Sequence, residues 1–412
     1  MTDPGFLYNF LGATFFLGAR VFLEVMVEGL WQYQHTPSTL ILVNHKRDLD
    51  VLVVAPILYF SRGLLRPGRP ITFAAREDLF LPGFLGAYLE APRSVRRLLA
   101  RLDLKPVLRR LRAAPIRRFP ERTVREILFE VLEVRGDLPL ESCLNEKVSF
   151  VSGIDPQLPL SKVVARVDLP WLHQPASLDI LGQPLHDILR RRQPLVVEEQ
   201  LAYFCKVLEE GGVVYLAPEG VLSTDGRMGR LRGGLHYLLE HAQGVRALPV
   251  GLSYDFLTTG RMGVFVAIGP SRTDLAGLPR PQRTQEVRRL LAGLITVTFS
   301  QIAGWVIMKL LETEVEEIEA IVLEETIRHR AHLLDVEGIR VDRRLFDEEW
   351  FHWRWRRFLA FGRRKGILRI SRTRILLNRE AILKGGQTYR ENPIRYAANE
   401  LKSTLQELGV VL

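Results

Sequence analysis

The sequence predicts an α/β fold in which a mixed, largely parallel sheet is flanked by helices, with an amphipathic helix before it and a helical domain after it. Two observations support this class. Short apolar runs that end in polar or glycine-containing stretches recur along the chain, as expected of buried strands, and segments of helical character separate them. With 412 residues, the chain is also long enough for one large domain and a smaller one, or for two domains.

The composition indicates a globular protein. Hydrophobic residues make up 47% of the chain and charged residues 25%, which excludes wholesale disorder. The two cysteines, Cys143 and Cys205, are too few for a disulfide framework and lack the spacing of metal ligands. We therefore expect a reducing environment on the cytosolic side.

The net charge of +10 is unevenly distributed. Residues 61–125 carry 16 Lys and Arg against 5 Asp and Glu, and residues 340–412 carry 17 against 8. Two basic regions of this kind predict phosphate-bearing partners, such as anionic lipid, a nucleotide-containing donor, an acidic carrier protein or nucleic acid.

The N-terminal segment is the most lipid-like part of the chain. The run Phe6–Ala19 carries no charge but is shorter than the roughly 20 residues that a spanning helix needs. On a helix continued to Trp31, Arg20, Glu24 and Glu28 share one face and leave a broad apolar arc. This pattern predicts an amphipathic helix that lies on a membrane, and a helix docked on the protein's own core is the alternative. The segment lacks the basic start and the cleavage site of a signal peptide.

The first strand leads to a histidine. Leu40–Val43 is typical of a buried strand, and the polar pair Asn44-His45 follows it directly. The apolar run Val51–Leu58 is expected to form a helix or a second buried segment. His45 and Asp50 can therefore meet only if His45 lies just before such a helix.

A second strand ends in the same way. Val213–Ala217 is followed by Pro218-Glu219-Gly220, and side chains at the carboxyl ends of strands build the sites of open α/β sheets. The basic, glycine-containing loop 223–234 suits phosphate, although it lacks the Gly-Lys-Ser/Thr ending of a nucleotide-binding loop. Further strands are expected at Ile71–Arg76 and Arg246–Tyr254, and helices at Val196–Glu210 and Leu235–Ala242.

The middle of the chain is expected to hold a large insert, at about residues 91–195. From Arg93 to Arg125, arginines interleave with leucines, which is typical of a basic amphipathic helix or of an ordinary solvated face. The expected organisation is a membrane-associating helix over residues 1–31, a main domain over 32–282 and a helical domain over 283–412.

The C-terminal region contains two ambiguous segments. Val287 to about Leu334 is expected to be a long helical region, and its uncharged part, Leu294–Met308, can pack on the core or touch lipid. The cluster of Trp, Phe and Arg over Trp350–Phe358 suits a lipid headgroup zone or single-stranded nucleic acid, and a packed helical domain is the alternative. His329 and His332 have no evident third partner, so we expect no metal there.

Three blocks of the sequence resemble the glycerolipid acyltransferase superfamily, which includes the glycerol-3-phosphate and 1-acylglycerol-3-phosphate O-acyltransferases. Asn44–Asp50 resembles the His-x4-Asp block of that family, and Pro218-Glu219-Gly220 with Ser223 resembles its Pro-Glu-Gly-Thr-Arg-Ser block. Leu248–Asp255 resembles its late strand. The similarity covers roughly residues 35–275, and Leu222 stands where the family has an arginine.

Acyl transfer to an alcohol needs a base, because a free hydroxyl is a poor nucleophile at neutral pH. We expect His45 to be that base and Asp50 to orient it. Glu219 and Gly220 would line the acceptor site, where Glu219 bonds an acceptor hydroxyl or shapes the loop. Arg117 or Arg118, in the position of the family's arginine block, would hold the acceptor phosphate. Further substrate contacts are expected at Ser223, Arg227 and Pro249.

The expected function is therefore that of a glycerolipid O-acyltransferase. It would use acyl-CoA or acyl-carrier protein as co-substrate, glycerol-3-phosphate or 1-acylglycerol-3-phosphate as acceptor, and no cofactor or metal. Its expected place is on the cytoplasmic side of the cell membrane, peripheral or monotopic, in contact with anionic lipid. The alternative is a non-catalytic basic protein that binds anionic membrane or nucleic acid.

Overall fold

The computed structural model describes residues 5–88, 92–99, 101–117, 122–146, 148, 154–166 and 168–410. The chain divides into two compact units. Unit 1 comprises residues 1–8 and 72–207, and unit 2 comprises residues 9–71 and 208–412. The boundary expected near residue 282 falls inside unit 2, so the sheet around His45 and the C-terminal helices belong to the same unit. The helix α1 and the helix α9 each cross from one unit to the other in sequence.

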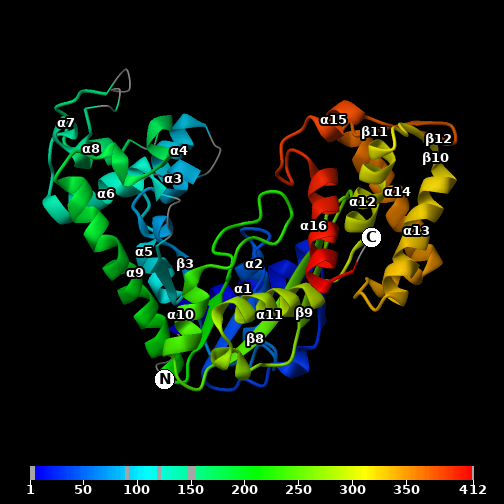
Figure 1. Cartoon of the computed structure of the whole chain (residues 1–412), viewed down its shortest axis with the longest axis horizontal. Coiled ribbons are helices and arrows are strands. Elements are labelled where there is room, and N and C mark those ends of the chain that lie inside the picture. Colours follow the sequence, from blue (N-terminus) through cyan, green and yellow to red (C-terminus); the bar gives the residue numbers. More distant parts are fainter. Residues whose placement is uncertain are drawn as a thin grey trace. The chain divides into compact units, whose positions relative to one another are not determined.

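Unit 2 contains most of the sheet (Figure 1). Its sheet strands are β1 (Leu23–Glu28), β2 (Thr39–Val43), β7 (Val213–Leu216), β8 (Arg246–Asp255) and β9 (Met262–Ile268). They are hydrogen-bonded in the order β1-β9-β8-β2-β7. β2 runs parallel to both β7 and β8, β1 runs parallel to β9, and only β8 and β9 are antiparallel. The carboxyl ends of β2, β7 and β8 therefore meet at one edge.

Helices cover this sheet and extend beyond it. The helices of unit 2 that follow α1 (Gly5–Phe22) are α2 (Asp50–Tyr59), α10 (Gly233–His241), α11 (Arg280–Gly293), α12 (Phe299–Glu312), α13 (Ala320–Val336), α14 (Glu348–Arg364), α15 (Arg379–Leu383) and α16 (Pro393–Leu408). A small sheet in the order β10-β12-β11 comprises β10 (Glu317–Glu319), β11 (Leu368–Ser371) and β12 (Arg374–Leu377). In Figure 1, α16 runs alongside α12.

Unit 1 has a core of its own. Its helices are α3 (Phe84–Tyr88), α4 (Arg93–Leu99), α5 (Lys105–Arg110), α6 (Val124–Arg135), α7 (Leu140–Cys143), α8 (Leu160–Val164) and α9 (Leu185–Glu209), and its strands are β3 (Ile71–Arg76), β4 (Ala113–Ile116), β5 (Arg122–Thr123) and β6 (Pro175–Ala176). β3 and β4 pair in parallel. Apolar side chains of α6, α7 and α8 form a buried cluster, among them Ile127, Leu140 and Val163. The region from Arg93 to Arg125 is thus built of short elements and not of one basic helix.

The fold class is confirmed. The chain is α/β, with a mostly parallel, seven-stranded mixed sheet flanked by helices, an N-terminal helix and C-terminal helices. The apolar runs expected to be strands are β2, β3, β7 and β8, and their bounds differ from the expected ones by one residue at most. β2 and β7 are short, rich in β-branched residues and buried throughout, which is why the pattern identifies them.

The N-terminal prediction is wrong in its second half. The helix α1 ends at Phe22, and Leu23–Glu28 is the strand β1, paired with β9. Glu24 and Glu28 therefore lie on a strand, where Glu28 forms an ion pair with Arg340 and Glu24 lies 3.6 Å from Arg344. Residues spaced by four share a side of a strand as well as of a helix, so the charge spacing could not separate the two.

The surface of α1 is apolar. Phe6, Phe10, Leu17 and Val21 are half or more exposed, whereas Phe16 is buried. By length and composition alone, this 18-residue helix is long and apolar enough to cross a membrane.

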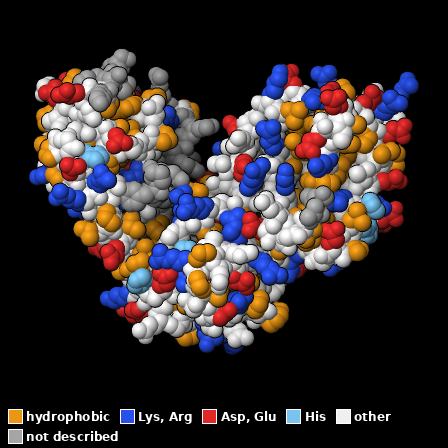
Figure 2. Space-filling model, in the orientation of Figure 1, with side chains coloured by type: hydrophobic (Ala, Val, Ile, Leu, Met, Phe, Trp, Pro, Cys, Tyr) orange, Lys and Arg blue, Asp and Glu red, His pale blue; other side chains and the backbone are white. Residues whose placement is uncertain are grey.

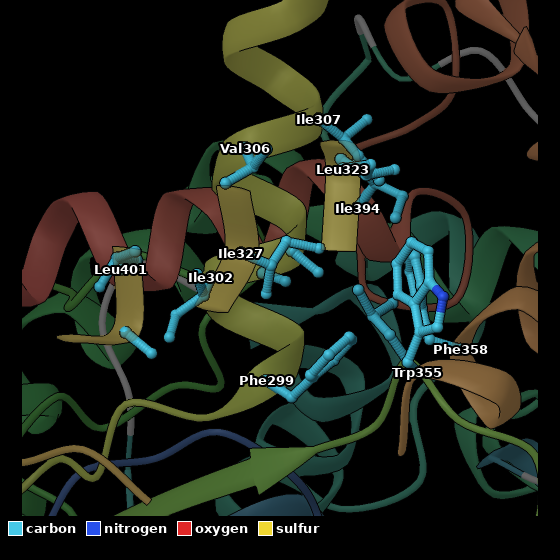
Figure 3. Packing of buried hydrophobic residues seen from close by; sticks show 14 of the residues in the cluster. Phe299, Ile302, Val306, Ile307, Leu323, Ile327, Trp355, Phe358, Ile394 and Leu401 are labelled. Carbon is cyan, nitrogen blue, oxygen red and sulfur yellow. The ribbon is translucent and has the colours of Figure 1, made fainter. Parts of the chain in front are cut away.

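The region from Val287 to Leu334 is not one helix. It is broken between α11, α12 and α13 by Leu294–Thr298 and by β10. The uncharged run Leu294–Met308 packs on the core, as one of the two alternatives expected. Figure 3 shows Phe299, Ile302 and Val306 of α12 packed with residues of α13, α14 and α16, and all of these side chains are buried.

Candidate active site

The end of β2 is fixed to the neighbouring strand by a buried asparagine. The Asn44 side-chain amide donates to the Leu252 carbonyl at 2.9 Å, and its oxygen accepts from the Leu252 amide at 2.7 Å. The side chain thus continues the pairing of β2 with β8 for one more residue. The backbone leaves the sheet directly after it, so the position of His45 is set by the sheet and not by a free loop.

His45 and Asp50 form the pair that the sequence predicts. The His45 Nδ1 lies 3.0 Å from the Asp50 Oδ2, and the His45 side chain is 22% exposed while that of Asp50 is 1% exposed. Asp50 is the first residue of α2, and His45 lies in the turn before it. This is the arrangement that the five-residue spacing requires.

Asp50 is held as an acceptor by further donors. Its Oδ2 accepts from the backbone amides of Lys46 at 2.6 Å and Arg47 at 2.9 Å, and its Oδ1 accepts from the Tyr254 hydroxyl at 2.5 Å. Burial and the nearby Asp50 charge raise the pKa of Tyr254 well above its usual value, so the hydroxyl stays a donor. An ionised carboxylate can only accept, which places the proton of His45 on Nδ1 and leaves the lone pair on Nε2.

Glu219 holds the backbone of the site. Its Oε1 accepts from the His45 amide at 3.1 Å, and its Oε2 accepts from the Gly229 amide at 2.5 Å. The side chain is 1% exposed, and the Ser223 amide donates to the His45 carbonyl at 3.1 Å. Of the two roles expected for Glu219, the structure places it in the one that shapes the loop.

Gly220 and Ser223 give that loop its path. Gly220 has a φ of +70°, and a Cβ there would lie 3.0 Å from the Arg232 side chain, so the turn needs glycine. The Ser223 hydroxyl accepts from the Gly226 amide at 2.9 Å and donates to the Arg227 carbonyl at 2.8 Å. Arg227 itself is exposed, with its Nε 3.5 Å from Asp225. It remains available to a ligand, whereas Ser223 is occupied within the loop.

Three other substrate contacts are predicted, at Pro249, Arg117 and Arg118. Pro249 is buried in the middle of β8, opposite Leu42 of β2. Arg117 belongs to unit 1, where Glu77 engages its Nε at 2.7 Å and Glu130 engages its Nη1 at 2.6 Å. Burial acts against the charge, but these carboxylates outweigh it, and the pKa of Arg117 is raised. A phosphate would have to displace Glu77 to reach it. Arg118 lies outside the described residues.

Sequence reasoning missed the part played by the C-terminal helix. One face of α16 contacts the loop that follows Glu219: the Asn399 amide donates to the Asp225 carbonyl at 2.9 Å, and the Ser403 hydroxyl accepts from the Met228 amide at 3.0 Å. Glu407 on the same face pairs with Arg288, which donates to the Gly229 carbonyl at 2.6 Å. We call these contacts the α16 clamp. The available signal was the spacing of polar residues by three and four on one side of an otherwise amphipathic helix.

Lys46, which follows His45, also contacts both α16 and the loop after Glu219, and we count these contacts in the α16 clamp. Its Nζ lies 3.3 Å from Glu400 and donates to the Gly226 carbonyl at 2.9 Å, and both charged side chains are buried. Burial raises the pKa of Glu400, although the charges of Lys46 and Arg47 oppose that shift. The residue next to His45 is thus tied to both the loop and α16.

The aromatic and basic cluster over Trp350–Phe358 has a buried side and an exposed side, and His352, Trp353 and Arg356 lie on the exposed side. Arg354 is 2% exposed and pairs with Asp255 through its Nε at 2.6 Å and its Nη2 at 2.7 Å. Phe351, Trp355 and Phe358 are buried with it. The packed-domain alternative is therefore confirmed for these residues.

Among the described residues, no group of three or more His, Cys, Asp or Glu side chains is placed to hold a metal ion. The comparisons with known proteins assign no family and no activity to the chain. The chain matches no protein-family model and no curated protein.

Proposed function

We propose that the protein is a glycerolipid O-acyltransferase, which moves an acyl chain from acyl-CoA or acyl-carrier protein to glycerol-3-phosphate or 1-acylglycerol-3-phosphate. One observation carries the proposal: the His45 Nδ1 lies 3.0 Å from an almost fully buried Asp50 carboxylate, which leaves Nε2 as a base. The resemblance of three sequence blocks to that superfamily supports the same reaction.

The reaction follows from the properties of the imidazole. Nε2 takes the proton of the acceptor hydroxyl as its oxygen attacks the thioester carbonyl. The new C–O bond forms, the C–S bond breaks, and the proton passes from His45 to the departing thiolate. Asp50 stabilises the imidazolium formed between these two transfers. The acceptor supplies the nucleophile, so no serine or cysteine of the chain and no cofactor is needed.

The test is thiol release by the purified full-length protein. Acyl-CoA and acyl-carrier protein are each supplied with glycerol-3-phosphate or with its 1-acyl derivative, and free thiol is measured. We expect acceptor-dependent release that His45→Ala lowers by about 100-fold to 10,000-fold. His241→Ala, on the exposed surface of α10, is the matched control and keeps wild-type activity. Near-normal thiol release by a folded His45→Ala protein would refute the proposal.

The same purified protein also distinguishes the acyltransferase from the alternative, a non-catalytic basic protein. A non-catalytic basic protein would release no thiol with any acceptor and would shift nucleic acid in a gel in a salt-sensitive way. On the face seen in Figure 2, Lys and Arg side chains lie interspersed with Asp and Glu. That distribution does not favour a nucleic-acid surface over an enzyme.

We also propose that α1 attaches the protein to the cytoplasmic side of the membrane. Its exposed stripe of Phe6, Phe10, Leu17 and Val21 is the support. Flotation with vesicles of phosphatidylglycerol and phosphatidylcholine in equal parts measures the attachment. The double substitution F10E/L17E should abolish it, whereas V336E, at an exposed apolar residue of α13, should not. Equal flotation of all three proteins would rule out this role of α1.

A further inference from the structure

The guanidinium of Arg47 lies among three aromatic rings. Its Cζ is 4.1 Å from the ring centre of Tyr389, 4.8 Å from that of Tyr254 and 4.9 Å from that of Phe256. The rings come from β8, from the segment directly after β8 and from the segment between α15 and α16. We call this group the Arg47 cage. Three separate segments of unit 2 thus hold one cation in place.

The charge of Arg47 is not neutralised by an ion pair within the described residues, although it acts at longer range on the buried Glu400 carboxylate. Among the described residues, no carboxylate lies within ion-pair distance of it, and its Nη2 is buried without a hydrogen-bond partner. A buried donor without an acceptor destabilises the fold, and a charged one does so more. Aromatic faces stabilise a cation but do not accept its in-plane N–H groups as an oxygen does.

Most buried arginines of the described residues pair with a carboxylate, whereas buried Arg125 contacts backbone carbonyls and Arg47 contacts aromatic rings. Arg354 pairs with Asp255, Arg283 with Glu240, and Arg117 with Glu77 and Glu130. The sequence thus places a carboxylate beside each of these guanidinium groups. At Arg47 it places aromatic rings, and the buried Nη2 has no hydrogen-bond acceptor from the protein.

The Arg47 cage is attached to the His45–Asp50 pair. The Arg47 amide donates to the Asp50 Oδ2 at 2.9 Å, and that same oxygen contacts the His45 Nδ1. Tyr254 forms one wall of the cage with its ring and donates its hydroxyl to the Asp50 Oδ1 at 2.5 Å. A ligand bound at Arg47 is therefore held on the same rigid frame as the proposed base.

We infer that Arg47 binds a phosphate group of a substrate through its Nη2. The choice of substrate rests on the proposed function. Arg47 would supply a cation two residues from His45, whereas Leu222, which stands where the resembled family has an arginine, cannot supply one. A guanidinium fork matches the oxygens of a phosphate, and a site walled by aromatic rings strengthens the contact by excluding water. The phosphate belongs either to the glycerol-phosphate acceptor or to the CoA donor.

Isothermal titration of the full-length protein tests this inference without any turnover. The probes are glycerol-3-phosphate, CoA and inorganic phosphate. We expect Arg47→Gln to weaken glycerol-3-phosphate or CoA by at least tenfold, and the probe that is weakened identifies the source of the phosphate. Arg246→Gln removes an exposed arginine at the opposite end of β8 and should change each affinity less than twofold.

A second variant keeps the test decisive if Arg47→Gln does not fold. Arg47→Lys keeps the charge and loses the planar fork, so it should fold and bind phosphate at least threefold more weakly. Wild-type affinity for all three probes in both folded variants, or no binding of any probe by the wild type, overturns the inference. If binding depends on Arg47 but thiol release does not depend on His45, the phosphate site is supported and the proposed acyltransferase activity is refuted.

Discussion

Glu219 accepts a hydrogen bond from the backbone amide of His45 at 3.1 Å, across 174 residues of sequence. Its second oxygen takes the Gly229 amide, so one buried carboxylate joins the turn before α2 to the loop after β7. The proposed base is thus positioned through its backbone by Glu219 and through its side chain by Asp50. These two supports can be removed separately.

Glu219→Gln should weaken both the fold and the activity. A glutamine presents an NH2 group to one of the two amides, which leaves a buried N–H without an acceptor at a cost of about 1–3 kcal/mol. We expect a lower urea midpoint and at least tenfold slower thiol release. Glu380→Gln is the control, because that carboxylate is 76% exposed in its pair with Lys384. Equal stability of Glu219→Gln and wild type would contradict the assigned contacts.

Asp50→Asn should act on kcat far more than on KM. The two backbone amides of Lys46 and Arg47 hold the asparagine oxygen in the place of Oδ2, and its NH2 group faces the Tyr254 hydroxyl. Nδ1 therefore keeps its proton, but the imidazolium loses the negative charge that stabilises it. We expect a loss of about 100-fold to 10,000-fold in kcat. Asp48→Asn, at an exposed residue of the same turn, should stay within twofold. If kcat is unchanged and only KM rises, Asp50 does not orient His45.

The Lys46–Glu400 pair should show strong coupling in a double-mutant cycle. Both groups are buried, so Lys46→Met or Glu400→Gln alone leaves a charge without its partner and should cost about 3–5 kcal/mol. The double variant should lose less than the sum of the two. Tryptophan fluorescence during urea unfolding reports on this unit, because five of the six tryptophans lie in it.

The exposed pair Lys384–Glu380 is the matched control for that cycle. Its coupling should not exceed about 0.5 kcal/mol, since solvent screens both charges. Additive losses at Lys46 and Glu400 would show that the two charges do not stabilise each other.

His35 should make the protein acid-sensitive. Burial, together with the charges of Arg62 and Arg69, lowers its pKa to about 4, while its Nε2 lies 2.7 Å from the Ser61 hydroxyl. The unfolded chain binds a proton near pH 6.5 and the folded chain does not, so stability is complete above about pH 6.5 and falls progressively towards pH 4. The slope from this group is at most about 1.4 kcal/mol per pH unit.

Urea midpoints between pH 4 and pH 7.5 measure this dependence. His35→Asn keeps a residue type that tolerates the left-handed φ of +52° at this position and removes the titrating group. The variant should have a shallower slope over that range. An unchanged slope would assign the acid sensitivity to other groups.

Much of the sheet could be predicted because its strands are short and continuously apolar. β2 and β7 are recognisable from their own residues, and so is the arrival of His45 and Glu219 at strand ends. β1 was not recognised, because its identity as a strand depends on pairing with β9, more than 200 residues away. The spacing of residues within a short segment carries no information on its pairing with a segment so distant in sequence.

The site was predictable only in part for the same reason. Five residues separate His45 from Asp50, so their pairing follows from one turn of chain. The contacts of Lys46 with Glu400 and of Asp255 with Arg354 join distant segments. Before its partner is known, a charged residue in an apolar cluster, such as Arg354, is indistinguishable from one that faces a headgroup or a nucleotide.

The α16 clamp also determines when the site can be completed during synthesis of the chain. On a ribosome, β2, β7 and β8 emerge well before residues 393–408, which carry Asn399, Glu400 and Ser403. Until those residues leave the exit tunnel, Lys46 has no partner and the loop after Glu219 lacks its clamp. A nascent chain therefore carries its imidazole long before it carries a finished site.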